Sequence, residues 1–329
     1  MLALLDSDPT KLRFYDPVTD SEIPFDPWYF SKSGGYGLIR YRRSGVWSPS
    51  AENQIEIYGG NAAVESYAPG DTYGSQNVWV DAVRYFHNGC TTDATGTANA
   101  TAEGGVTPGG VAGKIGLATD YNGSGHYANA GNATDLSFTS GGSDTAVSFS
   151  AWINMDDATG FRIAAKRATA ATAEYIFASN PSDEYSNVFY SSPTPTVLNR
   201  TITASSTSDE GSWIHLVATY DGSETVGGNL LYRQGAAPAS STTDNGYTGM
   251  TATSSDLNIG RYEQGTSHAN GKLCALGIWS ITLSPSWVSV DFASQNDVAG
   301  WQLDNGVVVL SSGRRKKVGG FDQSMETGR

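Results

Sequence analysis

Four stretches of this sequence decide the fold: AVSFSAWINM (146–155), GSWIHLVATYDGS (211–223), SDLNIGRYEQG (255–265) and GKLCALGIWSITLS (271–284). Apolar and polar residues alternate along much of them, which places apolar side chains on one side of an extended chain. In the first stretch Phe149, Ala151 and Ile153 share one side, while Ser150 and Trp152 share the other. The alternation predicts half-buried strands rather than helices.

Further short segments of the same kind recur about every ten residues, with turn residues between them. They include LRFYD (12–16), NQIEIYGGN (53–61), FRIAAKR (161–167), EYIFAS (174–179) and GNLLYRQG (228–235). This spacing predicts an all-β chain built as an antiparallel β-sandwich. One helical segment is predicted at 284–295, where Ser284 can cap the N-terminus and Pro285 suits the first position.

The chain divides into four parts by composition. Residues 1–89 read as a smaller N-terminal β domain, and residues 114–295 as the main sandwich. Residues 90–113 are rich in Gly, Thr and Ala, and two interpretations stay open for them: a flexible connector, or a long ordered loop that wraps the sandwich. Residues 296–329 contain a hairpin candidate followed by a basic tail.

Composition excludes several classes of protein. Charged residues make up 16% of the chain and aromatic residues 11%, a balance that argues against disorder. The net charge of −13 predicts repulsion from nucleic acid and from anionic membranes. No segment approaches the roughly 18 apolar residues of a membrane span, so no membrane insertion is expected. We expect Cys90 and Cys274 to be free, buried thiols, with a single disulfide as the alternative.

The N-terminal sequence bears on localisation. The start, MLALLDSDPTKLRFYD (1–16), has no basic residue before a short apolar run, which does not match a secretory signal. The sequence therefore suggests either a chain released by lysis, as virion proteins are, or a chain whose natural start is missing.

Residues 114–294 resemble the laminin-G-like, concanavalin A-like jelly rolls found in bacterial and phage surface proteins. The motifs that carry this resemblance are GKIGLATDYNGSGHYA (113–128), VSFSAWINM (147–155), GSWIHLVATYDGS (211–223), LNIGR (257–261) and GKLCALGIWSITLS (271–284). Residues 1–85 resemble a small β domain of unknown function that often precedes this jelly roll. The matching segments there are LRFYDPVTDSEIPF (12–25), IEIYGGNAA (55–63) and GDTYGSQNVW (70–79).

The resemblance implies two kinds of binding site. Members of the family often bind Ca²⁺ through acidic side chains and loop carbonyls, and calcium is the one cofactor expected here. The candidate calcium ligands are Asp93, Asn99, Asp120, Asn122 and Asp144, for which ordinary turn chemistry is the alternative. Sugars bind such folds through aromatic faces and polar side chains of loops. The candidate sugar-binding residues are Tyr127, Tyr185, Tyr190, Tyr247, Arg261 and Tyr262, each of which could instead be structural.

No catalytic constellation is found. Glucanases related to this fold carry Glu-x-Asp-x-x-Glu on one strand, and nothing in this sequence matches that pattern. The four histidines are spaced too widely for a local zinc motif: His87, His126, His215 and His268. His215 alternates with apolar neighbours and is expected to pack or hydrogen-bond inside the sandwich. We therefore predict that the chain is not an enzyme.

Together these features predict a virion surface protein: a capsid decoration, fibre or tail appendage that attaches weakly to host-surface glycans. Its expected partners are other virion proteins, such as the major capsid protein, and host glycans, with a homo-oligomeric or multicopy arrangement. The first alternative is a secreted bacterial adhesin or carbohydrate-binding module at the cell surface. The second is a polysaccharide-degrading enzyme of the same sandwich class.

Overall fold

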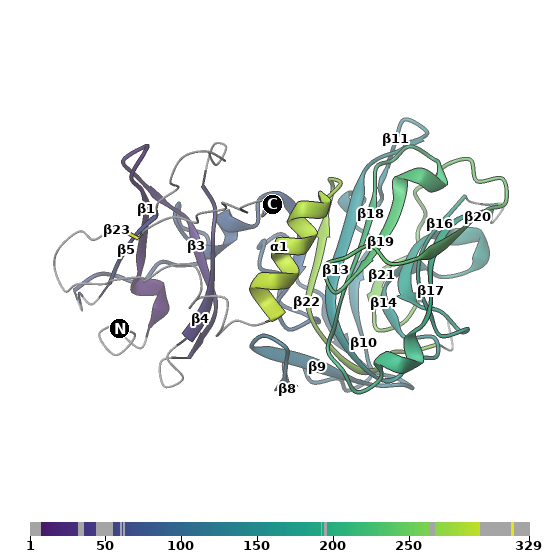
Figure 1. Cartoon of the computed structure of the whole chain (residues 1–329), viewed down its shortest axis with the longest axis horizontal. Helices are drawn as coiled ribbons and strands as arrows, with labels where there is room; N and C mark the ends of the chain where they lie inside the picture. The colour runs from purple at the N-terminus through teal and green to yellow at the C-terminus, as the bar shows by residue number, and fades with distance from the viewer. Residues whose placement is uncertain are drawn as a thin grey trace, which may run out of the picture. The chain divides into compact units, whose positions relative to one another are not determined.

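The protein consists of two compact units, Met1–Val80 with Ser294–Arg329, and Asp81–Ala293. A computed structural model describes residues 8–31, 36–43, 55–59, 61, 63–191, 193, 196–262, 267–296 and 317–318. Strands dominate the described residues of both units, and the helix α1 (Pro285–Asn296) follows the last long strand (Figure 1). No helix within these residues has the length and apolar character needed to cross a membrane.

The first unit contains a four-stranded sheet in the order β2-β1-β5-β23 and a separate hairpin of β3 and β4. Its strands are β1 (Arg13–Asp16), β2 (Ser21–Ile23), β3 (Phe25–Ser31), β4 (Tyr36–Tyr41), β5 (Ile55–Tyr58) and β23 (Lys317–Val318). Two 3-10 turns are η2 (Pro9–Lys11) and η3 (Ser75–Val78). Its small core consists of Leu12, Phe14, Ile23, Phe25 and Ile55. The hairpin predicted within 296–329 lies outside the described residues.

The second unit is the predicted antiparallel sandwich. One sheet has eight strands in the order β20-β17-β16-β15-β14-β21-β10-β7, and the other has the path β19-β18-β13-β22-β9-β8, with β6 also paired to β22. The strands of the eight-stranded sheet are β7 (Thr101–Glu103), β10 (Tyr127–Gly131), β14 (Arg162–Arg167), β15 (Ala173–Ser179), β16 (Glu184–Tyr190), β17 (Val197–Ser205), β20 (Ser240–Asp244) and β21 (Leu257–Ile259). The strands of the seven-stranded sheet are β6 (Ala82–Phe86), β8 (Val111–Ala112), β9 (Leu117–Asn122), β13 (Val147–Asp157), β18 (Ile214–Tyr220), β19 (Asn229–Arg233) and β22 (Asn270–Trp279).

Short elements complete this unit. They are the hairpin of β11 (Thr139–Ser140) and β12 (Ser143–Asp144), and the 3-10 turns η4 (Thr134–Leu136), η5 (Ala170–Thr172), η6 (Ser206–Asp209) and η7 (Val226–Gly228). The two large sheets lie face to face (Figure 1), and their facing side chains form one core. Phe149 and Phe177 come from opposite sheets, and their rings stack in this core at a centroid distance of 5.8 Å. The four deciding stretches supply β13, β18, β21 and β22, and the predicted sandwich is confirmed.

The boundary between the units lies earlier than the sequence suggested. The sequence assigned residues up to 89 to the first domain, but β6 pairs with β22 in the second unit. Tyr85 and Phe86 are 2% and 0% exposed there, and the ring of Tyr85 lies 5.9 Å from that of Trp279. Since these side chains bury their apolar surface against β22, the boundary falls between Val80 and Asp81.

Residues 90–113 form an ordered loop, which is the second of the two interpretations of this segment. The segment contains β7 and β8, which extend one edge of each large sheet. Cys90, Ala100 and Val106 belong to the core of the sandwich. Asp93 orders the loop around itself, because its two carboxylate oxygens accept hydrogen bonds from four donors of Tyr85, Thr95 and Ala98. Few large side chains are needed when an internal carboxylate supplies the contacts.

Helix α1 begins as the sequence predicted. The Ser284 hydroxyl accepts a hydrogen bond from the Trp287 amide at 3.1 Å, the bond expected of an N-cap. The Phe292 ring lies 5.9 Å from the rings of Trp152 and His215, and His215 Nε2 lies 3.2 Å from Asp291 Oδ2. His215 is 1% exposed, so it packs and hydrogen-bonds as expected.

Candidate functional site on the outer face of the eight-stranded sheet

A row of directly paired residues crosses the whole eight-stranded sheet. In order, its members are Thr101, Asn129, Asn258, Ala165, Ile176, Val188, Asn199 and Thr243. Paired residues on neighbouring strands project to the same side of a sheet. Ala165 and Ile176 belong to a small cluster separate from the main core. The row therefore lies on the face that points away from the core, here called the outer face.

Irregularities in β14 bring two arginines to this face. Arg162 and Arg167 are an odd number of residues apart, and a regular strand would place them on opposite sides of the sheet. The pairing of β14 with β15 shifts between Arg162 and Ala164, where one extra residue is inserted in β14. A β-bulge of this kind restores an odd-spaced residue to the same face. Both arginines thus share the outer face with Ala165.

Two tyrosines meet these arginines. The guanidinium carbon of Arg162 lies 5.4 Å from the centre of the Tyr262 ring, and that of Arg167 lies 5.2 Å from it. Arg167 also lies 5.1 Å from the Tyr190 ring, and its Nη1 donates to the Tyr190 hydroxyl at 3.1 Å. Both distances to Tyr262 are within the range of cation–π attraction. We refer to Arg162, Arg167, Tyr190 and Tyr262 as the Tyr–Arg cluster.

The floor of the Tyr–Arg cluster is made of small and aliphatic side chains. Ala165, Ile176 and Ala178 are at most 3% exposed, and the rings of Tyr190 and Tyr262 pack against them. The two rings are themselves only half-buried. The result is a firm apolar base with two phenol rings and two guanidinium groups above it.

The outer face contains polar atoms that have no hydrogen-bond partner in the described part of the chain. These buried atoms without a hydrogen bond are Arg162 Nε, Arg167 Nε, Arg261 Nε, Asn199 Oδ1 and Asn258 Oδ1. Arg162 is 6% exposed, and burial lowers the pKa of its guanidinium from the ordinary value. Among the described residues, neither Arg162 nor Arg167 forms an ion pair with a carboxylate. Within the described residues, aromatic faces and neutral groups are the partners of both charges.

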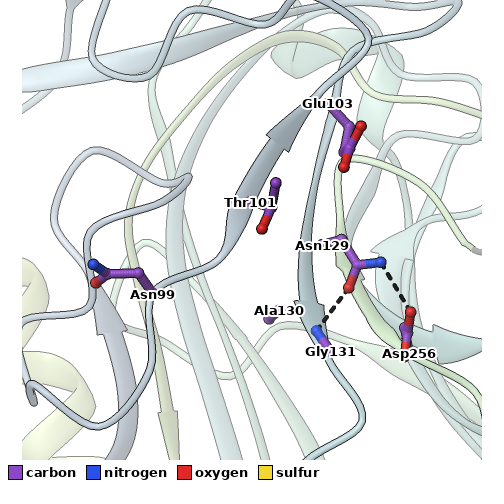
Figure 2. Close-up of a pocket in the computed structure, with 7 residues that line it drawn as sticks. All are labelled: Asn99, Thr101, Glu103, Asn129, Ala130, Gly131 and Asp256. Carbon is purple, nitrogen blue, oxygen red and sulfur yellow. Dashed lines mark hydrogen bonds between the residues drawn. The ribbon is translucent and has the colours of Figure 1, made fainter.

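A polar hollow opens at the β7–β10 edge of the same face. Figure 2 shows the residues that line it: Asn99, Thr101, Glu103, Asn129, Ala130, Gly131 and Asp256. Its volume is about 350 Å³. Asn129 is held in place because its Nδ2 donates to Asp256 Oδ2 at 2.9 Å and its Oδ1 accepts from the Gly131 amide at 2.7 Å. Thr101 and Asn129 also belong to the row that leads to the Tyr–Arg cluster.

The structure brings four of the six predicted sugar-binding residues to the outer face. Tyr190 and Tyr262 form part of the Tyr–Arg cluster. The ring of Tyr127 lies 3.3 Å from the guanidinium carbon of Arg261, a closely stacked pair. The pairing of Tyr127 with Glu103 places that stacked pair next to the polar hollow. Tyr127, Tyr190 and the adjacent pair Arg261 and Tyr262 come from three distant parts of the chain, so only the fold gathers them.

The prediction was wrong for the other two tyrosines. Tyr185 is 1% exposed, and its hydroxyl donates to Asp209 Oδ2 at 2.8 Å inside the sandwich. Tyr247 is 8% exposed, and its hydroxyl donates to Asp144 Oδ2. Burial raises the pKa of both phenols well above the ordinary value. Their rings fill the core and satisfy buried carboxylates, so they offer no surface to a sugar.

The five predicted calcium ligands do not gather at one place. Asp93 and Asn99 lie together in the 90–113 loop, where Asn99 Oδ1 accepts from the Asp93 amide at 2.9 Å. Asn122 Oδ1 accepts from three consecutive amides that begin at Ser124, which forms a turn. The oxygens of these three residues are thus occupied by turn-forming hydrogen bonds, as the alternative interpretation held.

The remaining two candidates also stand apart. Asp120 lies exposed on β9, paired with Lys272 of β22. Asp144 accepts hydrogen bonds from Tyr220 at 2.7 Å and from the Met250 amide at 2.6 Å, besides that of Tyr247. Burial raises the pKa of Asp144. Across the described part of the chain, no group of three or more His, Cys, Asp or Glu side chains could hold a metal ion.

The sequence did not single out four residues that the outer face depends on: Arg162, Arg167, Asn199 and Asn258. Both arginines were read only as the ends of a strand. Their odd spacing gave no sign of a shared face, because a bulge cannot be located from alternation alone. The two asparagines did carry a signal, since an Asn inside an apolar strand is unfavourable in the absence of a special role.

The arrangement is suited to holding a polar, ring-shaped molecule. Phenol rings can pack against the C–H faces of such a ring, and the unpaired nitrogen and oxygen atoms can hydrogen-bond to its hydroxyl groups. Concave or flat sites with a few fixed polar groups on an apolar base are typical of small-ligand binding. The Tyr–Arg cluster itself contains no carboxylate that could act as an acid or base.

Comparisons with solved structures find similar chains at low sequence identity, and one of those described here, with a TM-score above 0.5, shares the fold. The binding domain of Paraclostridial Mosquitocidal Protein 1 is similar with a TM-score of 0.51 and 12% identity, over 65% of this chain and 52% of that one. The receptor binding domain of botulinum neurotoxin C/D mosaic serotype has a TM-score of 0.48 and 13% identity, over 65% and 51% of the two chains. This chain thus spans about half the length of these structures.

The comparison with sequence families is more specific. No curated protein matches the sequence. A model of the concanavalin A-like lectin/glucanases superfamily matches residues 122–289, which covers most of the sandwich and about half of the chain. The predicted laminin-G-like resemblance falls on the same residues. The chain therefore belongs to the concanavalin A-like lectin/glucanases superfamily.

Proposed function

We propose that this protein is a non-catalytic carbohydrate-binding module and that the outer face of the eight-stranded sheet binds the carbohydrate. One observation carries the proposal: five buried polar atoms on this face have no hydrogen-bond partner among the residues that the structure describes. Each unpaired buried polar atom costs about 1–3 kcal/mol. Each such group calls for an explanation, such as strain, a water molecule, an ion or a ligand, and at this face we infer a ligand.

A carbohydrate fits the chemistry of the face. Its hydroxyl groups both donate and accept, so they can pair with the half-buried amide of Asn199 and with the half-buried guanidinium of Arg167. Tyr190 and Tyr262 present half-buried rings over an apolar floor, which suits the C–H face of a sugar. Thr101 and Asn129 continue the polar row toward the hollow in Figure 2. An extended oligosaccharide could therefore contact several strands.

Binding is favoured over hydrolysis by the groups available at the cluster. Hydrolysis of a glycosidic bond generally needs two carboxyl groups roughly 5–10 Å apart across the scissile bond. The Tyr–Arg cluster offers guanidinium and phenol groups instead. Glu103 and Asp256 lie at the edge, in the polar hollow, and Asp256 is engaged by Asn129. Release of reducing sugar from a bound polysaccharide would revive the polysaccharide-degrading alternative.

The binding face can be tested by removing its aromatic rings. We expect Tyr262→Ala and Tyr190→Ala each to weaken carbohydrate binding about tenfold, or ~1.4 kcal/mol, since each loses a stacking surface. Tyr262→Phe should keep most of the affinity because the ring remains. Binding is measured by calorimetry with oligosaccharides selected on a glycan array.

A matched control comes from the other sheet. Leu230 is an exposed apolar residue on β19, 37% accessible, and Leu230→Ala removes a side chain of similar character without touching the outer face. Its binding should equal that of the wild type. If Tyr262→Ala and Leu230→Ala bind equally well, the outer face is not the binding face.

The biological setting stays a prediction from the sequence. A capsid decoration, fibre or tail appendage would be a stoichiometric component of purified particles, which mass spectrometry detects. A secreted adhesin or cell-surface module would instead be found outside bacterial cells. In either setting, multiple copies would raise a weak affinity through avidity. Calcium binding by the loops also stays a prediction, and repeating the binding measurements with EDTA tests it.

A further inference from the structure

The outer face has a charge that contrasts with the rest of the chain. The protein has a net charge of −13, yet Arg162 and Arg167 stand together on this face without a carboxylate partner among the described residues. Buried cations elsewhere in the second unit are paired. Lys166, for example, contacts Glu174 at 2.7 Å, and Arg84 contacts Asp135 at 2.9 Å. The arginines of the Tyr–Arg cluster differ from these buried cations, because no carboxylate among the described residues pairs with them.

The two guanidinium groups lie beside one ring. Both are within 5.4 Å of the centre of the Tyr262 ring, so they repel each other across a short distance. Arg162 is only 6% exposed, so its charge has little contact with water. Burying a charge is costly unless it is paired, and an aromatic face compensates only in part. A third group with negative charge would offset both the burial and the repulsion.

The unpaired atoms show where such a group would bind. Arg162 Nε and Arg167 Nε have no hydrogen-bond partner among the described residues, while Nη1 of Arg167 donates to the Tyr190 hydroxyl. Nε together with one terminal nitrogen forms the planar fork that matches two oxygens of a carboxylate or a sulfate. Arg162 Nη1 donates to the Ser179 carbonyl at 3.5 Å, so on each arginine the fork of Nε and Nη2 has no partner among the described residues.

We propose that the ligand of this face is an anionic carbohydrate, whose carboxylate or sulfate group binds between Arg162 and Arg167. The inference rests on the proposed carbohydrate-binding function and adds the class of sugar. Tyr190 and Tyr262 hold the ring that bears the acidic group. Thr101 and Asn129 accommodate neighbouring sugar units at the β7–β10 edge.

The test compares sugars that differ only in the acidic group. The probes are oligosaccharides that end in glucuronic acid or in glucose, and galactose oligosaccharides with or without a sulfate ester, displayed on one array. We expect the wild type to bind an acidic member of these pairs at least about tenfold more tightly than its neutral counterpart. The preference should shrink as salt is raised, because salt screens partly exposed charges.

Arginine substitutions locate the effect. Arg167→Gln removes one charge at the rim of the cluster and should reduce the ratio of acidic to neutral affinity about tenfold, as expected for a charge-assisted hydrogen bond. Arg162→Lys keeps the charge but loses the fork and should also lower that ratio. Lys272→Gln removes a charge from β22 in the other sheet and should leave the ratio unchanged.

The outcomes separate this inference from the proposed function. If neutral and acidic sugars bind equally, and Arg167→Gln leaves the ratio unchanged, the anionic ligand is wrong while carbohydrate binding stands. If the folded wild type binds no probe of any pair, both the anionic ligand and the proposed carbohydrate binding are wrong. Preference for the carboxylate or for the sulfate pair identifies which oxyanion the site takes.

Discussion

At the residue scale, burial governs the chemistry of the two cysteines. Cys90 and Cys274 are free and 0% exposed. Burial raises the pKa of Cys90 and raises that of Cys274 to about 11. The thiolate is the reactive form of cysteine, so both positions are protected by protonation and by lack of access. The sequence-based expectation of two free, buried thiols is confirmed.

Thiol titration tests this protection. We expect Ellman's reagent at about pH 8 to find no reactive thiol in the native protein and both thiols in denaturant. The folded pKa of Cys274 lies above its unfolded value, so the protonated thiol contributes stability at lower pH. That contribution is lost as the pH rises from about 9 through about 11. Rapid modification of the native protein near neutral pH would contradict the assignment.

The sugar-binding prediction placed some tyrosines on the outer face correctly and included others that are buried in the core. Tyr190 and Tyr185 lie on the same strand, β16, yet one packs on the outer face and the other in the core. A tyrosine suits both places, because its ring is apolar and its hydroxyl can hydrogen-bond. The two are five residues apart, so alternation along β16 places them on opposite faces, and the face of Tyr185 also supplies the buried partner Asp209.

At the element scale, the N-cap of α1 fixes where the helix begins. Ser284→Ala would remove the hydroxyl that accepts from the Trp287 amide. The expected loss is about 1 kcal/mol of stability, because one helix-terminal amide loses its partner. Urea denaturation followed by tryptophan fluorescence measures it.

A second serine in the same helix provides the control. Ser289 is exposed in the middle of α1. Ser289→Ala should be neutral or slightly stabilising, by up to about 0.5 kcal/mol, since Ala is the better helix former. Equal destabilisation by both changes would show that the Ser284 cap is not what they perturb.

In strand β14, the simple alternation of side chains between the two faces does not hold along the whole strand. Alternation within FRIAAKR correctly predicts a strand, but the insertion at Ile163 changes which residues share a face. A bulge costs little locally and is stabilised by contacts from neighbouring strands, so the segment alone does not encode it. The pair that dominates the outer face was therefore invisible in the sequence.

At the scale of the whole molecule, the second unit holds every residue of the outer face. A fragment of residues 81–296 contains both large sheets, including β6, and helix α1. We expect it to unfold cooperatively and to bind carbohydrate with the affinity of the full chain. Thermal unfolding and calorimetry provide the measurements.

Two shorter fragments test the boundary itself. A fragment of residues 90–296 lacks β6, and with it the Tyr85 and Phe86 side chains that pack into the second unit. A fragment of residues 114–296 also loses the ordered loop and both edge strands. Each should be less stable than residues 81–296, because buried apolar surface becomes exposed. Equal stability of all three would place the boundary where the sequence first suggested.

The sequence by itself determined the sandwich, the start of α1, the free thiols and the lack of a recognisable catalytic motif. These follow from local signals: alternation along a strand, a Ser-Pro pair before a helix, and residue spacing within one segment. The tertiary structure decided the domain boundary, the ordered 90–113 loop and the composition of the outer face. Each of these depends on pairing between segments far apart in the chain. Arg162 and Tyr262 become neighbours only when β14 and β21 pair, and the bulge in β14 places Arg162 on the same face as Arg167.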